Sequence, residues 1–123
     1  MKRLILSLIL LLLIPIHSHA QTNHLDQSFQ SFWLKFKAAV ANNDKQAIAS
    51  MTKLPFLFED KQRTRAKFIK IYNQLFDMKV RKCFARAKVQ AEGELYEVFC
   101  AKRIYYFGKE GEKYKFIEFG VDY

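Results

Sequence analysis

Histidine and cysteine are the residues most able to do chemistry in this chain, and both are scarce. The 123 residues include three histidines and two cysteines. His17 and His19 precede a predicted cleavage point after Ala20, which leaves His24 near the new N-terminus. One histidine there offers no Ser-His or Cys-His arrangement within the fold and no zinc-type ligand cluster. The composition therefore predicts no catalytic triad, no metal site and no cofactor.

The N-terminus has the three-part pattern of a cleaved secretory signal. Lys2 and Arg3 form a positive start, residues 4–16 are mostly apolar, and small residues precede the cleavage point after Ala20. A membrane-spanning helix needs roughly 20 apolar residues, so the run is too short to be an anchor. We predict a periplasmic or secreted protein with one domain, residues 21–123, that does not span a membrane.

Cys83 and Cys100 both remain in that oxidising compartment. An even number of cysteines in a small exported domain favours a disulfide, and two reduced core thiols are the alternative. A tight turn at 90–93 would place the two cysteines opposite each other on neighbouring strands, which agrees with a bridge. A catalytic Cys100 would need a nearby base, and none is evident.

The segment 29–76 predicts three helices. Apolar residues recur with helical spacing from Phe29, and Asn42-Asn43 ends this first helix. Asp44 can cap a second helix that runs to about Met51. A short strand at 54–58 and a charged loop at 59–63 follow, and Thr64 can cap a third helix that runs to about residue 76.

From Met78 the apolar period changes to two, which is typical of strands. The pattern predicts strands at 80–90, 94–107 and 112–121, with turns at 91–93 and 108–111. Helices followed by an antiparallel meander define an α+β domain, with the helices packed on one face of the sheet.

Two stretches resemble the secreted members of the nuclear-transport-factor-2-like (cystatin-like) superfamily: F..FW..F..A...ND..A.AS.TK.PF at 29–56 and C....YYFGK..E.YKF.EFGV at 100–121. The resemblance implies a cone, in which a curved sheet wraps round a long helix and leaves a cavity at its open end. The superfamily includes isomerases, dehydratases and cyclases, and many non-catalytic binding or accessory domains. Its enzymes usually place an Asp with a His or Tyr in the cavity, and this chain has no histidine to offer there.

The predicted strand registers assign residues to the two faces of the sheet. The helix-covered face would carry small or apolar residues: Cys83, Ala85, Ala87, Val98, Cys100, Phe119 and Val121. Toward one end the same face becomes basic, which predicts a ligand site for a carboxylate or phosphate group made by Arg81, Lys102, Lys113, Lys115 and Tyr106. The alternative is that these lysines are simply solvated.

The opposite face of the predicted sheet is rich in aromatic residues, which often mark an interface. We predict a homodimer that forms through this face. The contact residues would be Phe84, Phe99, Tyr105, Tyr114 and Phe116. Arg103 and Glu118 on the same face are expected to pair across the strands.

The charge balance bears on the choice of partner. The chain has 21 Lys+Arg against 12 Asp+Glu, which favours a small anionic or amphipathic ligand or an acidic envelope partner. Export makes nucleic acid an improbable partner. We predict a non-catalytic binding or accessory protein. One alternative is a small cyclase, isomerase or dehydratase using Tyr72, Tyr96, Tyr106 or Asp77, and another is an exported inhibitor or immunity-type protein.

Overall fold

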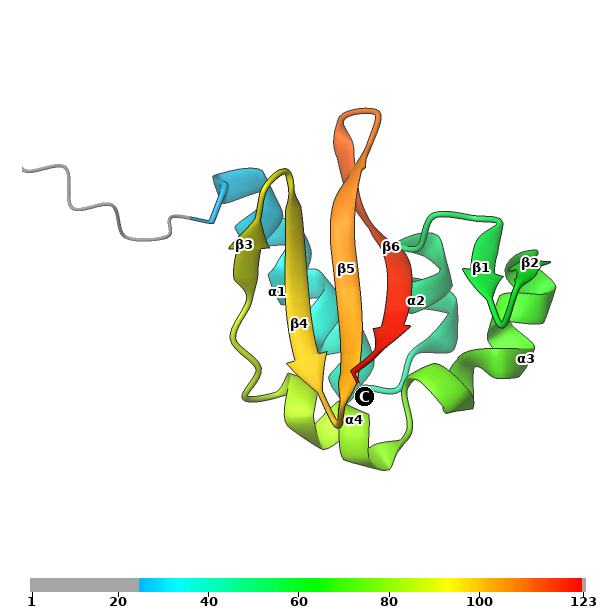
Figure 1. Ribbon diagram of the computed structural model, residues 1–123. Coiled ribbons are helices and arrows are strands. Elements are labelled where there is room, and N and C mark those ends of the chain that lie inside the picture. The colour runs from blue at the N-terminus through cyan, green and yellow to red at the C-terminus, as the bar shows by residue number, and fades with distance from the viewer. Residues whose placement is uncertain (1–24, 123) are drawn as a thin grey trace, which may run out of the picture.

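The computed structural model describes residues 25–122, which form an α+β domain (Figure 1). Its elements in chain order are α1 (Gln27–Ala41), α2 (Lys45–Ser50), β1 (Phe56–Phe58), β2 (Lys61–Arg63), α3 (Arg65–Leu75), α4 (Met78–Phe84), β3 (Gln90–Glu92), β4 (Leu95–Cys100), β5 (Arg103–Glu110) and β6 (Lys113–Val121). β3 to β6 form an antiparallel sheet in chain order, and β1 pairs with β2 in a separate hairpin. The predicted fold class is confirmed. The predicted signal segment, residues 1–20, lies outside the described residues.

All four helices begin at a side chain that accepts a main-chain N–H. Asp44 accepts from Ala47 at 3.1 Å, and Thr64 accepts from Lys67 at 3.5 Å, so both predicted caps are confirmed. Asp26 caps α1 in the same way, and Asp77 caps α4. In residues 25–122 no helix is long and apolar enough to cross a membrane.

The core lies between α1 and one face of the four-stranded sheet. α1 buries one apolar face, which includes Phe29, Trp33 and Phe36. The ring of Phe36 packs edge-on against Phe107 of β5, with centroids 5.0 Å apart. The outer face of the sheet is left uncovered by the helices (Figure 1). The predicted packing of helices on one sheet face is therefore present.

The predicted strand at 80–90 is wrong, because α4 occupies its first half. Asp77 accepts the N–H of Val80 at 3.0 Å and starts a helix in place of a strand. Val80 and Phe84 are four residues apart and both are buried, which is helical spacing. The chain then runs without regular structure to β3.

The predicted strand at 94–107 is also wrong, because it folds back on itself at Ala101-Lys102. Both residues have positive φ, 54° and 60°, and Cys100 pairs with Arg103 across the turn. Two-residue hairpin turns with positive φ at both residues favour Gly or Asn. Ala101-Lys102 contains neither, so the sequence did not indicate a turn here. The meander has four strands where three were expected.

The last hairpin turns later than predicted, since Glu110 pairs with Lys113. A bulge beside Tyr106 and Phe107 shifts the register once more. Because a one-residue shift exchanges the two faces of a strand, the predicted faces are reversed along β5 and the first half of β6, where Tyr105, Phe107 and Phe116 are fully buried. Val98, Cys100 and Phe119 lie on the core side as predicted, the last because the bulge restores the register.

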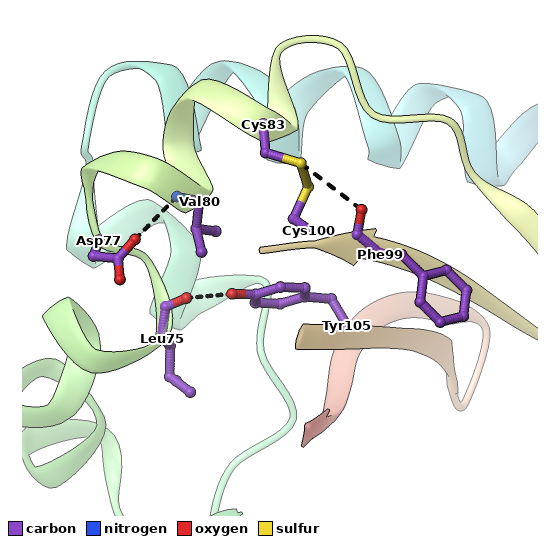
Figure 2. The surroundings of a disulfide bond; sticks show 7 residues. All are labelled: Leu75, Asp77, Val80, Cys83, Phe99, Cys100 and Tyr105. Carbon is purple, nitrogen blue, oxygen red and sulfur yellow. Dashed lines mark hydrogen bonds between the residues drawn. A yellow bond between two sulfur atoms is a disulfide. The ribbon is translucent and has the colours of Figure 1, made fainter. Parts of the chain in front are cut away.

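The predicted disulfide between Cys83 and Cys100 is present, with Cα atoms 5.7 Å apart. It joins the last turn of α4 to the end of β4 and does not link two strands (Figure 2). The expected cross-strand geometry is therefore wrong although the pairing is right. Close by, the hydroxyl of Tyr105 donates to the Leu75 carbonyl at the end of α3 (Figure 2).

Candidate functional site: a groove between the β1–β2 hairpin and β6

A groove of about 760 Å³ lies between the β1–β2 hairpin and the C-terminal half of β6. The end of α3 and the first residue of β5 close it on the inner side. It is lined by Leu57, Phe58, Glu59, Asp60, Gln74, Asp77, Arg103, Glu118, Phe119, Gly120 and Val121. Its volume is within the range typical of small-molecule sites.

The β1–β2 hairpin holds two carboxylates at the rim of the groove. Glu59 and Asp60 form the turn with φ of 52° and 60°, a left-handed conformation that costs a non-glycine residue roughly 1–2 kcal/mol. Arg63 supports the turn, because its Nε and Nη2 donate to the Phe58 carbonyl at 3.2 and 3.1 Å. Its guanidinium also lies 5.6 Å from the centre of the Phe58 ring. The hairpin is thus held in a conformation that presents acidic side chains.

The inner end of the groove contains an ion pair between Arg103 and Asp77. Arg103 Nη2 lies 2.8 Å from Asp77 Oδ2, and this is the one ion pair within residues 25–122. The hydrogen bond from Arg103, opposed by partial burial and helped by the N–H of Val80, lowers the pKa of Asp77. Nη1 of Arg103 is buried and has no hydrogen-bond partner in the described part of the chain. Arg103 was expected to pair with Glu118, and it pairs with Asp77 instead.

The groove is acidic in a chain that is basic overall. Four acidic residues, Glu59, Asp60, Asp77 and Glu118, line it together with one guanidinium, that of Arg103. Glu118 lies at its outer edge, where its side chain is next to Tyr106 on the outer face of the sheet. The whole chain has a formal net charge of +9. A groove that concentrates negative charge attracts cations and repels anions.

Apolar side chains flank these charges. Leu57 is 55% exposed and Val121 is 48% exposed, so both offer apolar surface to solvent at the groove. Phe58 and Phe119 form the floor between them, with ring centroids 5.9 Å apart. The groove can therefore contact an apolar group and a positive charge of the same ligand.

Among residues 25–122, those that line the groove do not include the partners of a hydroxyl or thiol nucleophile. The groove presents no Ser, Thr, Cys, Lys, His or Tyr side chain among its described lining residues. Asp77 is held ionised by Arg103, which makes its carboxylate a weak base.

The predicted cluster of basic ligand-binding residues is not formed. Lys102 lies in the β4–β5 turn, whereas Lys113 begins β6 beside the β5–β6 turn at the opposite end of β5 (Figure 1). Arg81 lies on α4, where its Nη1 donates to the Phe76 carbonyl at 2.8 Å. The prediction that these residues share one end of one sheet face is wrong because it assumed an unbroken strand through Ala101.

Two of the predicted basic residues do share a second, smaller groove. Lys113 and Lys115 lie with Lys35 of α1 around a space of about 420 Å³, beside Phe32 and Met51. Lys115 Nζ also donates to the Ser50 carbonyl at 2.8 Å. Anion binding by these lysines stays a prediction.

Three of the five predicted interface residues belong to the core. Phe84 is 1% exposed, and Tyr105 and Phe116 are 0% exposed, so their placement on an open face is wrong. Tyr114 is half-buried and donates to Asp26 Oδ2 at 2.8 Å. Phe99 alone is exposed, and its ring points away from the disulfide and the core (Figure 2). Dimerisation through the outer face stays a prediction.

The alternative acid/base candidates do not gather in the groove. Tyr72 is fully buried, and burial raises the pKa of its hydroxyl to about 12. Tyr96 is also buried, and its hydroxyl accepts the N–H of Asp26 at 3.1 Å. Only Asp77 lines the groove.

Tyr106 lies among carboxylates on the outer face of the sheet. It pairs with Glu97 on β4 and with Glu118 on β6. Glu97 is 8% exposed, and burial, followed by the nearby Glu92 carboxylate, raises its pKa. A tyrosine in this setting is no part of a basic ligand site.

Replacing Glu97 with glutamine is expected to stabilise the domain at pH 7 by up to about 1 kcal/mol, a size typical of a partly solvated charge. The raised pKa means that the folded protein binds more protons than the unfolded chain between the ordinary and the raised value. Stability is therefore expected to fall as the pH rises through that window. Urea denaturation at pH 4 and pH 7 checks this: the gain from Glu97→Gln should shrink at pH 4. An equal gain at both pH values would contradict it.

Sequence reasoning missed the contribution of the hairpin to the groove. Glu59 and Asp60 were expected to lie in a charged loop, and no glycine or asparagine signalled a turn. Phe56, Leu57 and Phe58 are all apolar, so the sequence had no alternation that would place Leu57 on the exposed side of β1, where the structure has it.

No protein-family model matches this sequence, and no curated protein matches it either. The fold and the groove together define a small α+β domain with an acidic, apolar-walled groove beside its sheet.

Proposed function

We propose that this chain is an exported, non-catalytic binding domain whose groove takes a cationic group carried on an apolar body. The observation that carries the proposal is the set of four carboxylates against one guanidinium, in a groove whose walls expose Leu57 and Val121. A protonated amine or guanidinium would meet Glu59, Asp60 and Glu118, and the attached apolar part would cover the two aliphatic side chains.

The proposal keeps the predicted binding role, but the proposed ligand is cationic where the sequence predicted an anionic one. The expected anionic ligand rested on a basic cluster that the strand order separates. Export rests on the signal pattern, and membership of the nuclear-transport-factor-2-like superfamily rests on the two sequence patterns quoted above. The predicted enzyme alternative gains no support from the groove, because Asp77 is the one residue of Tyr72, Tyr96, Tyr106 and Asp77 in its described lining. The inhibitor alternative stays a prediction.

Titration with octylamine and with octanoate tests the proposal, because the two probes share a chain and differ in charge. We expect octylamine to shift the amide NMR signals of 57–60 and 118–121, and octanoate to leave them in place. The double variant Glu59→Gln, Glu118→Gln should weaken octylamine binding about tenfold, the effect of roughly 1.4 kcal/mol.

Glu110→Gln provides the matched control, since Glu110 is an exposed carboxylate at the end of β5 outside the groove. It should leave octylamine binding unchanged. Equal shifts from octanoate at 57–60 would contradict the proposal. Octanoate shifts confined to Lys35, Lys113 and Lys115 would instead support anion binding at the smaller groove, which contains two of the predicted basic residues.

A further inference from the structure

β6 is an edge strand of which only the first half is covered. The sheet order ends at β6. Near its middle, the N–H of Phe116 donates to the Met51 carbonyl and the N–H of Lys53 donates to the Phe116 carbonyl, both at 2.8 Å. Beyond this point, no described segment pairs with the outer edge of 118–121.

The alternation of an antiparallel ladder identifies the main-chain groups that are left free. The N–H of Asp122 donates to the Lys102 carbonyl at 2.9 Å, so Asp122 faces β5. Every second residue faces the same way, so Gly120 and Glu118 also face β5. Phe119 and Val121 therefore direct their N–H and C=O groups away from the sheet. Within residues 25–122 these groups have no main-chain partner outside the ladder.

The free edge lies along the acidic groove. Glu118, Phe119, Gly120 and Val121 form one wall of it, and the β1–β2 hairpin forms the other. Four residues of strand extend over roughly 13 Å at about 3.3 Å per residue. Exposed strand edges are commonly protected by lysine or proline, and 117–121 contains neither.

We propose that an extended basic peptide binds in this groove as an added strand that pairs with Phe119 and Val121 of β6. The proposal rests on the cation-binding function proposed above and names its partner. Main-chain hydrogen bonds to the edge would give affinity, as in other complexes formed by strand addition. Lysine or arginine side chains on the peptide would meet Glu59, Asp60 and Glu118, and apolar residues between them would contact Leu57 and Val121.

The charge of the groove favours a basic peptide over other occupants of the edge. A second copy that paired its own β6 edge here would bring its Glu118 and the acidic hairpin against the same carboxylates, and like charges at close range are unfavourable. An acidic peptide would meet the same repulsion. Pairing with the open edge requires the peptide to have an extended backbone, and the carboxylates favour a peptide with positive charge.

A five-residue peptide, acetyl-Lys-Val-Lys-Val-Lys-amide, provides the probe. We expect it to shift the amide signals of Phe119 and Val121 and to slow their hydrogen exchange. Two N-methylated forms of the peptide are compared, one without the lysine N–H groups and one without the valine N–H groups. Because alternate residues of a strand direct their N–H groups to opposite edges, only one of the two forms loses the hydrogen bonds to β6. One form should bind at least tenfold more weakly and the other within about threefold, because each lost hydrogen bond costs roughly three- to tenfold in affinity.

Val121→Pro tests the same bond from the side of the protein. The N–H of Val121 points away from β5, so proline removes the free donor and leaves the ladder intact. Val121→Ala, which keeps the N–H, is the matched variant, because both changes remove the valine side chain from the groove. Peptide affinity should be about threefold to tenfold lower for Val121→Pro than for Val121→Ala, while the two variants should bind octylamine alike. Acetyl-Glu-Val-Glu-Val-Glu-amide is the charge control and should not bind.

Equal binding of the peptide and both methylated forms would overturn strand addition. If octylamine still bound in that case, the cation groove would stand without the added strand. If neither octylamine nor the basic peptide bound, both proposals would fail. Dimer formation through β6, detected as concentration-dependent sedimentation that Val121→Pro abolishes, would assign the edge to a second copy and overturn the peptide.

Discussion

Replacing Phe36 with alanine is expected to lower the free energy of unfolding by about 3–5 kcal/mol, the usual cost of truncating a buried phenylalanine. The ring of Phe36 is 0% exposed. It lies 5.0 Å from Phe107, 6.1 Å from Phe84 and 6.0 Å from Phe116, measured between ring centroids. One residue of α1 thus contacts α4 and two strands, and its removal leaves a cavity that no single neighbour can fill.

Leu34→Ala is the matched control for this variant, because Leu34 lies on the same helix and is 64% exposed. It should change stability by less than about 0.5 kcal/mol. Guanidinium denaturation followed by tryptophan fluorescence measures both variants, since Trp33 is the sole tryptophan. If Phe36→Ala fails to fold, Phe36→Leu should still unfold measurably earlier than the wild type. Similar losses for Phe36→Ala and Leu34→Ala would contradict the described core.

Removing the disulfide is expected to cost about 3 kcal/mol. The bond joins residues separated by 17 positions, and a loop of about that length corresponds to roughly 3 kcal/mol of chain entropy in the unfolded state. The loop includes the end of α4, the irregular segment after it, and all of β3. Loss of the bond should therefore loosen α4 and β3 before the rest of the sheet.

Two independent experiments measure this effect. The double variant Cys83→Ala, Cys100→Ala and the wild type with and without dithiothreitol should show the same lowering of the denaturation midpoint. Dithiothreitol should have no effect on the double variant. Hydrogen exchange should rise most in 78–92. An oxidised wild type that is no more stable than its reduced form would contradict the prediction.

The helices could be predicted because their signals are local. Asp44 and Thr64 cap the helices that they were expected to cap, since a capping side chain bonds to an N–H three residues away. The disulfide could be predicted because only two cysteines are available. The strand register that was used to support the pairing was wrong, because Cys83 lies on a helix and not on a strand.

The strand registers could not be predicted, and most errors follow from them. Ala101-Lys102 and Glu59-Asp60 both turn with left-handed geometry in the absence of glycine. Such turns are imposed by the pairing of the strands on either side, which lies outside any short window of sequence. A displaced turn then changes the faces of the residues that follow, up to the next bulge, which is why Tyr105 and Phe116 were expected outside the core that they occupy.

The sequence by itself therefore determined the α+β class, three of the four described helices, the N-caps of two of them, and the pairing of the cysteines, since these depend on local hydrogen bonds and on composition. The tertiary structure decided the groove. Its carboxylates come from the hairpin, from the start of α4 and from β6, and the Arg103 partner of Asp77 comes from β5. These segments are far apart in the chain and come together only when the strands pair in the correct register. The local sequence of one segment does not indicate which other segment it will contact.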